Sequence, residues 1–418
     1  MLTPDAFQTK LPFLGLAPFL RMNVAEVDLL PIGQAMLARA QDDDDPNLLM
    51  NLSCVLLCLG QRDLGLAIQN EALQVQRVYT IAAAQPAKFR LLMLMLPGDL
   101  STNIPLDCLL ENMDIELILY YVSADEPLAS PIPEHDALIV AISDQDAAHD
   151  ILTLLEQRLA DWPTPVLNSP QHIRTTERST ASRLLQNIPG LFMPSTLSAS
   201  RSELFAVILG KAKLSKLFVD IDFPIILRPQ GSHAGVDLDK IETVEEMANY
   251  LGRVNAADFF ISRFIDYRGQ DGLFRKYRVV LIDGHPYASH MAISSHWMIH
   301  YVNAGMYQDA AKREEEAAFM EHFSDFAQRH KTALQAMYER TQLDYFSIDC
   351  TETLDGQLFV FELDHAMVVH AMDPETLFPY KQRHILKAKL AFRELLCRIT
   401  TGSVPTSDGT SATDLTPG

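Results

Sequence analysis

Three acidic residues, Asp349, Glu362 and Asp364, stand in two short segments whose polar and apolar residues alternate. Residues 346–352 and 357–365 carry this alternation, which is typical of half-buried β-strands. Between them lies an Asp-Gly dipeptide, a strong signal for a tight hairpin turn. The pattern therefore predicts a β-hairpin that carries three acids.

The turn sets the register of this hairpin. If the two residues that flank the Asp-Gly dipeptide face each other, Asp349 lies directly opposite Glu362. Asp364 is two residues beyond Glu362 and so points to the same face. The other face of the hairpin is apolar and is predicted to pack on a core: Phe346, Ile348, Cys350, Phe359, Phe361 and Leu363.

Neighbouring carboxylates on one sheet face need a counter-charge or water. Directly opposed side chains have Cβ atoms about 4.5–5.5 Å apart, and like charges at that separation destabilise a sheet. A cation removes this penalty, and oxygen-only ligands suit Mg²⁺, which completes its shell with water and substrate phosphates. The alternative is an exposed acidic face that water solvates. Pairing alone supports both interpretations equally, and a register shift of one residue would remove the argument.

Composition limits the classes of partner. The chain has 418 residues, of which 48% are hydrophobic, and a formal charge of −20, so two or three domains are expected. Nucleic acid and anionic membranes require clustered cations, which makes both unsuitable as main partners. The five cysteines form no CxxC pair, and no signal peptide or spanning helix is evident. We therefore expect a cytoplasmic protein.

Hydrophobic periodicity divides the chain into four parts and predicts an α/β (α+β) fold. Residues 1–82 look helical and weakly resemble a tetratricopeptide-type hairpin; a helical cap or dimer contact is the plainer alternative. Apolar strands alternate with helical stretches over 86–168, which predicts a small parallel α/β domain. Residues 169–400 mix strands and helices, including one long amphipathic helix over 308–340. The polar segment 401–418 is expected to be disordered.

The order of several segments resembles the ATP-grasp superfamily, most closely its glutathione-synthetase-like ligases. Residues 168–196 resemble the helix that opens the nucleotide domain, and "FPIILRPQGSHAG" (223–235) resembles the strand and glycine-rich loop over the phosphates. "DFFISRFID" (258–266) resembles the hinge that binds adenine, and residues 277–305 resemble the strand pair and loop that flank the phosphates. The likeness spans roughly residues 86–400 and depends on the ordered set.

The resemblance implies metal-binding roles for the acids. In this superfamily an Asp on one strand and a Glu-x-Asn on the next hold two Mg²⁺ ions that bridge the phosphates of ATP. By this likeness Asp349, Glu362 and Asp364 are metal ligands. Asp364 stands where the family usually has Asn, so it adds a negative charge and leaves the number of metal ions open.

The same likeness implies contacts to the nucleotide. Arg228 stands where the family usually has Lys; its guanidinium can bind phosphate through two hydrogen bonds, and a structural ion pair is the alternative. Gly231 and Gly235 leave room for backbone amides to approach phosphate, and Ser232 adds a hydroxyl. The implied contacts to adenine come from the hinge strand: Arg263, Phe264 and Ile265.

Basic and histidine residues supply the remaining candidates. Arg278 lies in the densest basic cluster of the chain. Its place in the ordered segments that resemble the superfamily implies contact with a phosphate or a substrate carboxylate. Its neighbours Arg275 and Lys276 are surface charges in the plainer interpretation. His296 and His300 have the spacing of zinc ligands on a helix, but their aromatic and β-branched neighbours favour a strand or loop. Weaker candidates for contacts near the site are Asn303, His365 and His370.

Residues and resemblance together predict an ATP-dependent ligase that uses ATP and Mg²⁺. It would phosphorylate a small-molecule or peptide carboxylate and pass the acyl group to an amine, with Arg228 and Arg278 as catalytic residues. The alternatives are a non-catalytic nucleotide-binding helical-repeat scaffold and a small-molecule kinase of ATP-grasp type. The helical N-terminus leaves room for a protein or peptide partner, and the resemblance allows a homodimer.

Overall fold

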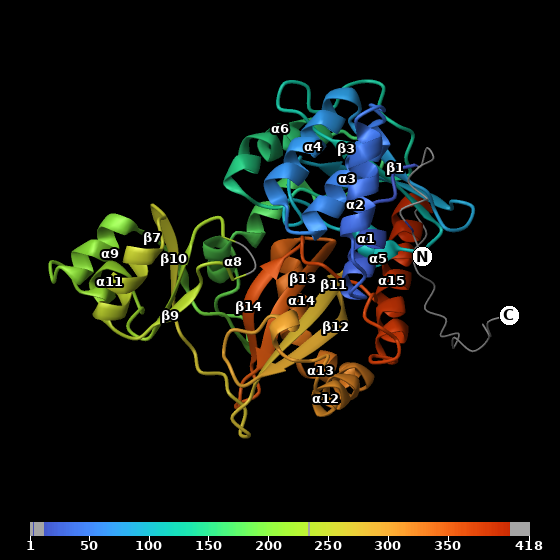
Figure 1. Ribbon diagram of the computed structural model, residues 1–418. Coiled ribbons are helices and arrows are strands. Elements are labelled where there is room, and N and C mark those ends of the chain that lie inside the picture. Colours follow the sequence, from blue (N-terminus) through green and yellow to red (C-terminus); the bar gives the residue numbers. More distant parts are fainter. Residues whose placement is uncertain (1–2, 4–11, 233–234, 402–418) are drawn as a thin grey trace.

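The computed structural model describes residue 3 and residues 12–232 and 235–401. These residues form helices and three β-sheets, which confirms the predicted α/β (α+β) class. Figure 1 shows a smaller unit, built on the second sheet, that stands beside a larger body containing the other two. Within the described ranges no helix is both long and apolar enough to cross a membrane. The predicted tail 401–418 lies outside them except for residue 401.

The first sheet has the strand order β1-β3-β2-β4-β5. Its strands are β1 (Val78–Ile81), β2 (Phe89–Met95), β3 (Ile115–Tyr121), β4 (Ala137–Val140) and β5 (Val166–Leu167). β2 to β5 run parallel, as their continuous apolar sequences predict, while β1 pairs antiparallel with β3 at the edge. β1 falls inside the range predicted to be wholly helical.

Helices cover both faces of this sheet. One face packs on the N-terminal helices, with Phe19 and Met36 in the same core as Leu91 of the sheet. The other face packs on a later helix, whose Leu155 belongs to the same core as Val140. The helices of this part are α1 (Ala17–Val24), α2 (Leu30–Ala40), α3 (Pro46–Cys58), α4 (Arg62–Val75), α5 (Leu106–Leu110) and α6 (His149–Leu159), with a 3-10 turn η2 (Asp146–Ala148). The N-terminal helices therefore share a core with the first sheet, and the domain boundary at residue 82 stays a prediction.

The second sheet is small and has its own core. Its order is β7-β10-β8-β9, all antiparallel: β7 (Thr196–Ser200), β8 (Ile225–Pro229), β9 (Asp239–Ile241) and β10 (Asp258–Arg263). Apolar residues of this sheet pack on α9 (Arg201–Ile208), α10 (Leu214–Leu217) and α11 (Val244–Arg253). The opposite face of β8 and β10 is left for another partner.

The third sheet carries the predicted acids and has the order β12-β11-β13-β14-β6. Its strands are β6 (Leu191–Phe192), β11 (Phe274–Ile282), β12 (His285–Ser294), β13 (Tyr345–Glu352) and β14 (Leu358–Asp364). The remaining elements near it are α7 (Pro170–Ile173), η3 (Arg174–Thr176), α8 (Arg178–Leu184) and η4 (Tyr301–Asn303).

The single long helix predicted over 308–340 is wrong. Three helices occupy this range: α12 (Ala310–Glu321), α13 (Phe323–Arg329) and α14 (Lys331–Thr341). The interruptions fall at His322 and His330, which have non-helical backbone angles. Both breaks let the chain turn so that Phe326 and Met337 reach the core of the third sheet. Apolar periodicity indicated helical residues correctly but did not reveal the changes of direction.

The hairpin that carries the acids differs from its prediction in two places that cancel. Its loop has three residues, because the Thr353 amide donates to the Gln357 carbonyl (3.0 Å) and Gly356 adopts φ +81°. A β-bulge then adds one residue to β14. The longer loop and the bulge offset each other, so Asp349 does lie opposite Glu362.

The same bulge overturns part of the predicted core face. Phe359 and Phe361 were expected to face the core, but the extra residue inverts the alternation between the bulge and the turn. Leu358 and Val360 enter the core beside Cys350 instead. The two phenylalanines make edge-to-face contacts with Tyr267 and line a cavity on the other side of the sheet.

The last helix, α15 (Lys381–Thr401), joins the parts of the larger body. Its apolar residues Ile385, Phe392 and Leu396 belong to the core shared by the N-terminal helices and the first sheet. Its polar side binds the segment before β3, where Arg393 forms an ion pair with Asp114 (2.7 Å). Both the first and third sheets pack against this helix.

Candidate active site

One cavity lies between the second and third sheets, with a volume of about 450 Å³. β8 and β10 form one wall, β11, β13 and β14 form the other, and residues 297–300 and 366–368 contribute from two loops. Nine of the eleven residues predicted for the site line it: Arg228, Gly235, Arg263, Phe264, Ile265, Arg278, Asp349, Glu362 and Asp364. Gly231 and Ser232 are absent from its described lining.

Asp349 is the most tightly held of the three acids. Nε of Arg278 donates to one carboxylate oxygen (2.8 Å), while Nη2 of Arg278 and Nζ of Lys276 donate to the other (3.1 and 2.9 Å). The side chain is only 5% exposed. Burial alone would raise the pKa of Asp349, but the two cations outweigh it and hold this pKa well below its usual range. Asp349 is therefore ionised and neutralised by protein cations.

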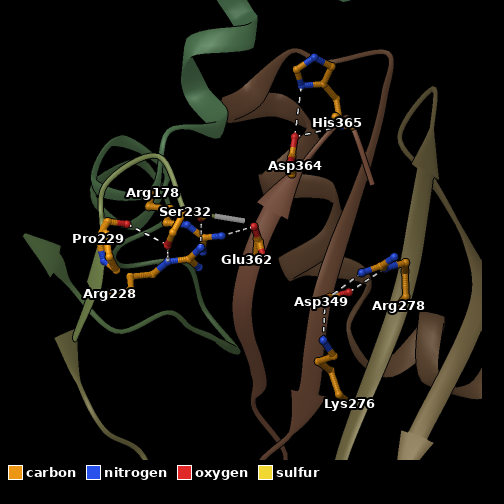
Figure 2. Close-up of polar contacts among 11 residues, drawn as sticks. Arg178, Arg228, Pro229, Ser232, Lys276, Arg278, Asp349, Glu362, Asp364 and His365 are labelled. Atoms are coloured by element: carbon orange, nitrogen blue, oxygen red, sulfur yellow. Dashed lines mark hydrogen bonds and ion pairs between the residues drawn. The ribbon is translucent and has the colours of Figure 1, made fainter. Parts of the chain in front are cut away.

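Glu362 points away from Asp349 and toward α8 (Figure 2). There it forms an ion pair with Arg178. Burial would raise the pKa of Glu362, but the charges of Arg178 and Arg228 lower it, and the net shift is downward. Glu362 thus sits between two guanidinium groups and, like Asp349, is ionised at neutral pH.

Asp364 turns toward the loop that follows its strand (Figure 2). Its Oδ1 accepts from the Ala366 amide (3.0 Å) and lies 3.6 Å from Nδ1 of His365. His365 is fully buried, and its Nε2 donates to the Ile142 carbonyl (2.8 Å). His365 therefore helps to hold the third sheet against the first sheet as an ordinary hydrogen-bonded histidine.

The three carboxylates share the cavity, but each turns to a different partner (Figure 2). In the part of the chain that the structure describes, no three His, Cys, Asp or Glu side chains converge to hold a metal ion. Their oxygen atoms have the right chemistry for Mg²⁺. In this arrangement, however, arginine and lysine supply for Asp349 and Glu362 the counter-charge that the sequence argument gave to a metal. Their assignment as metal ligands stays a prediction.

Arg228 ends β8 and anchors the glycine-rich loop. Its guanidinium donates to Oγ of Ser232 (3.3 Å) and to the Ser232 carbonyl. Burial and the nearby charge of Arg178 lower the pKa of Arg228 to about 10, so it is still protonated at neutral pH. Ser232 thus holds Arg228, which lines the cavity, while Ser232 itself does not line it.

Gly235 follows in the same loop and adopts φ +71°. A Cβ at this position would lie 2.5 Å from Nε2 of His300, which belongs to the loop after β12. Only glycine permits this approach together with the positive φ. His300, whose spacing from His296 matches zinc ligands on a helix, lies in a loop, as its neighbours in the sequence favoured, and contacts the glycine-rich loop.

The opposite end of β10 is aromatic. Phe264 packs edge-on against Trp297, with ring centroids 5.7 Å apart, and Lys240 lies 4.4 Å from the centroid of the Phe264 ring. On the same wall, Phe260 is the strand partner of Arg228. Phe260 and Phe264 are four residues apart, which along a strand is about 13 Å. The Phe264–Trp297 pair and Arg228 therefore mark two ends of one wall, with the cation Arg263 next to Phe264.

The sequence did not identify two cations of the site. Lys276 was predicted to be a surface charge, but it pairs with Asp349. It is two residues before Arg278 on β11, so strand alternation places both side chains on one face of the sheet. Arg275, on the other face, pairs with Glu315 and Asp271. Arg178 opens α8, and its approach to Glu362 joins positions 184 residues apart. No local signal in the sequence indicates that contact.

Comparison with known proteins finds similarity in structure only. No protein-family model matches the chain, and no curated protein matches it. A D-alanine–D-alanine ligase from Bacillus anthracis, solved with ATP, is 14% identical with a TM-score of 0.45, covering 76% of this chain and 99% of the ligase. A RimK domain ATP-grasp protein from Sphaerobacter thermophilus is 17% identical with a TM-score of 0.41, covering 72% and 98%. The ATP-grasp ligase PsnB, solved with a precursor variant, Mg and ADP, is 16% identical with a TM-score of 0.38, covering 73% and 99%.

Proposed function

We propose that this protein is an ATP-dependent ligase that activates a carboxylate as an acylphosphate and joins it to an amine. The observation that carries the proposal is the charge of the cavity. Five cationic and three carboxylate side chains line it, which leaves an excess of two positive charges in a chain whose formal charge is −20. Such a local reversal of sign favours a polyanionic ligand.

A nucleoside triphosphate matches both ends of the cavity. Phe264 and Trp297 offer ring faces and edges for a base. Arg228, about 13 Å away along the wall, offers a guanidinium suited to phosphate. The resemblance of the sequence to ATP-grasp ligases makes ATP the proposed nucleotide, with the backbone of Phe264 and Ile265 beside the base.

The acids organise the cations in this proposal. Asp349 fixes Arg278 and Lys276 side by side, and Glu362 fixes Arg178 next to Arg228. Cations held in place before the substrate arrives stabilise the charge that develops in phosphoryl transfer without having to reorganise. Asp349, Glu362 and Asp364 stay our proposed ligands for Mg²⁺, which would add positive charge beside the phosphates.

The reaction has two steps. A carboxylate oxygen of the acid substrate attacks the γ-phosphorus of ATP, and the bond to the β-phosphate oxygen breaks to release ADP. An amine then attacks the acyl carbon, phosphate leaves with the electrons of its C–O bond, and the amine loses a proton. The acid would bind beside Arg278, whose Nη1 donates to the Val368 carbonyl (3.2 Å) of the loop that lines the cavity after β14.

A trapping assay tests this proposal. Hydroxylamine is a strong nucleophile that converts acylphosphates to hydroxamates, so it replaces the unknown amine. Purified protein, ATP and MgCl₂ are incubated with hydroxylamine and a panel of amino acids, dicarboxylates and short peptides. We expect ADP and a hydroxamate to form together with at least one carboxylate. A phosphorylated product that resists hydroxylamine would indicate a kinase, and nucleotide binding with no turnover would indicate a scaffold; either result contradicts the proposal.

A further inference from the structure

A buried polar cluster lies behind the cavity and is not part of its lining. Glu316 of α12 is fully buried, and Lys381, which opens α15, is 2% exposed. Nζ of Lys381 binds Asp373 (2.9 Å) and the Tyr301 hydroxyl (2.5 Å), and it lies 3.4 Å from Glu316. The Tyr301 and Tyr380 hydroxyls both donate to one oxygen of Glu316 (2.9 and 2.6 Å).

The other oxygen of Glu316 accepts from the Met291 amide of β12 (3.0 Å). The aromatic rings of Tyr301 and Phe378 lie against the Lys381 ammonium, at 4.0 and 4.4 Å from their centroids. Every charged member therefore has close partners. The cluster joins five separate segments: β12, η4, α12, the loop after β14, and the start of α15.

Two of these segments continue directly into the cavity. Tyr301 follows His300, and the run from Trp297 to His300 lines the cavity. Asp373 lies in the loop after β14 whose first residues, Ala366 to Val368, line it from the other side. A single cluster thus anchors both loops that line the cavity, although none of its charged residues lines the cavity itself.

Stability alone does not account for the cluster. Two carboxylates and one ammonium are costly to bury, and apolar residues of similar volume often stabilise a core equally well or better. Apolar contacts have no preferred direction, whereas hydrogen bonds fix a side chain in one orientation. The cluster therefore needs an explanation in the geometry that it imposes.

We propose that Tyr301 is a positioning residue: its hydroxyl, held by Glu316 and Lys381, fixes the 297–303 loop so that His300 meets Gly235 and Trp297 meets Phe264 on the opposite wall. The cluster thereby holds the cavity closed over a nucleotide, and this part of the inference rests on the proposed function. The loop position itself is a property of the free protein and does not depend on that function.

Two isosteric variants test the proposal. Tyr301→Phe removes the hydroxyl on the cavity loop, and Tyr380→Phe removes the hydroxyl that donates to the same Glu316 oxygen from the residue before α15. In both variants Glu316 keeps the other tyrosine, Lys381 and the Met291 amide, so each protein should fold. A difference in behaviour between the two variants therefore comes from the loop that carries Tyr301, and not from the loss of one hydrogen bond to Glu316.

Trp297 reports the loop directly. The chain has two tryptophans, so a Trp162→Phe background leaves Trp297 as the only indole. In this background, acrylamide quenching of Trp297 should rise at least about twofold in Tyr301→Phe and stay near the background value in Tyr380→Phe. Equal quenching in the two variants, or no change in either, would overturn the proposal, provided that thermal melting confirms folding.

Nucleotide binding supplies the second readout. Titration with ATP and MgCl₂, followed by Trp297 emission, should give a dissociation constant about tenfold higher for Tyr301→Phe than for Tyr380→Phe. Matching affinities would refute the idea that the cluster serves the nucleotide. If the background protein does not bind ATP at all, the proposed function fails, and quenching still decides whether Tyr301 positions the loop.

Discussion

Asp349 and Arg278 lie directly opposite each other on adjacent strands, and both carboxylate oxygens of Asp349 accept hydrogen bonds from that guanidinium. A second cation, Lys276, shares one of the oxygens. Asp349 stays a predicted metal ligand, and in the structure it fixes two cations on the cavity wall. This relationship makes the acid both a stability element and an organiser of the site.

Asp349→Asn should destabilise the protein strongly. Removing one partner of a buried ion pair leaves the other charge uncompensated, which costs about 3–5 kcal/mol. We expect the free energy of unfolding, measured by denaturant titration, to fall by that amount at pH 7. A loss below about 1 kcal/mol would mean that Arg278 and Lys276 find other partners or solvent.

The same variant should change the acid sensitivity of the protein. The pKa of Asp349 is lowered in the folded state, so its contribution is fully present above the unfolded pKa of about 3.9 and is lost as pH falls below it. Wild-type unfolding free energy should therefore drop more steeply than that of Asp349→Asn below pH 4. Parallel curves would show that other carboxylates dominate acid unfolding.

Glu362→Ala should abolish turnover while the fold survives. Glu362 is 30% exposed at the side chain and touches the cavity, so its loss removes charge beside Arg178 more than it removes packing. Activity should fall by at least about 100-fold, the scale of one lost electrostatic contact in a transition state. Glu352 is the matched control, because it pairs with Arg329 and His330 away from the cavity. An active Glu362→Ala protein would overturn the site assignment.

The two ends of the cavity should be separable by ligand. Phe264→Ala removes a ring from the proposed base end and should weaken ATP binding about tenfold while leaving inorganic tripolyphosphate unaffected. Arg228→Met should weaken both ligands, because a phosphate contact serves both. Isothermal titration of the two variants with each ligand measures this. If Phe264→Ala impaired tripolyphosphate binding equally, the base end would have been misplaced.

Two glycines of one loop form a matched pair. Gly231 and Gly235 both have positive φ, so alanine at either costs roughly 1–2 kcal/mol in backbone strain. Open space surrounds Gly231, whereas a Cβ on Gly235 would strike His300. Melting temperatures should fall similarly in the two variants, while nucleotide affinity falls further in Gly235→Ala. The opposite ranking of affinities would contradict the contact across the cavity.

His370 should make stability depend on pH in a different range. Burial is the main cause that lowers the pKa of His370 to about 4, with Lys381 and Arg278 acting in the same direction and Asp373 opposing them. The unfolded chain binds this proton near pH 6.5, so stability falls as pH drops from 6.5 to 4, by up to roughly 3 kcal/mol. His370→Asn should flatten that slope in denaturant titrations at stepped pH. An unchanged slope would place its origin at other histidines.

Local patterns predicted the strands and their partners well. The apolar runs predicted the parallel strands of the first sheet. The Asp-Gly turn predicted Asp349 opposite Glu362, which holds because the longer loop and the bulge offset each other. The bulge in β14 was not predicted. It accompanies contacts of Phe359 and Phe361 with Tyr267, some ninety residues earlier, and local patterns do not reveal contacts over that separation. For the same reason Arg178 was not predicted as a site residue, because its contact with Glu362 joins distant parts of the chain.

The sequence predicted which residue types gather at the cavity but not how they are arranged. Acids, arginines and a glycine-rich loop do meet at one cavity. Counting charges on one hairpin suggested a metal, because the cations that pair with Asp349 and Glu362 come from β11 and α8. The tetratricopeptide-like character of the N-terminus, its protein or peptide partner, the homodimer and the cytoplasmic location all stay predictions.

The position of α15 has a consequence for biosynthesis. This helix follows every other described element in the chain, yet Phe392 and Leu396 complete the core around the N-terminal helices. Before those residues are synthesised, apolar side chains of the N-terminal helices lack part of their core. Nascent chains should therefore engage chaperones until α15 has been synthesised and covers these side chains.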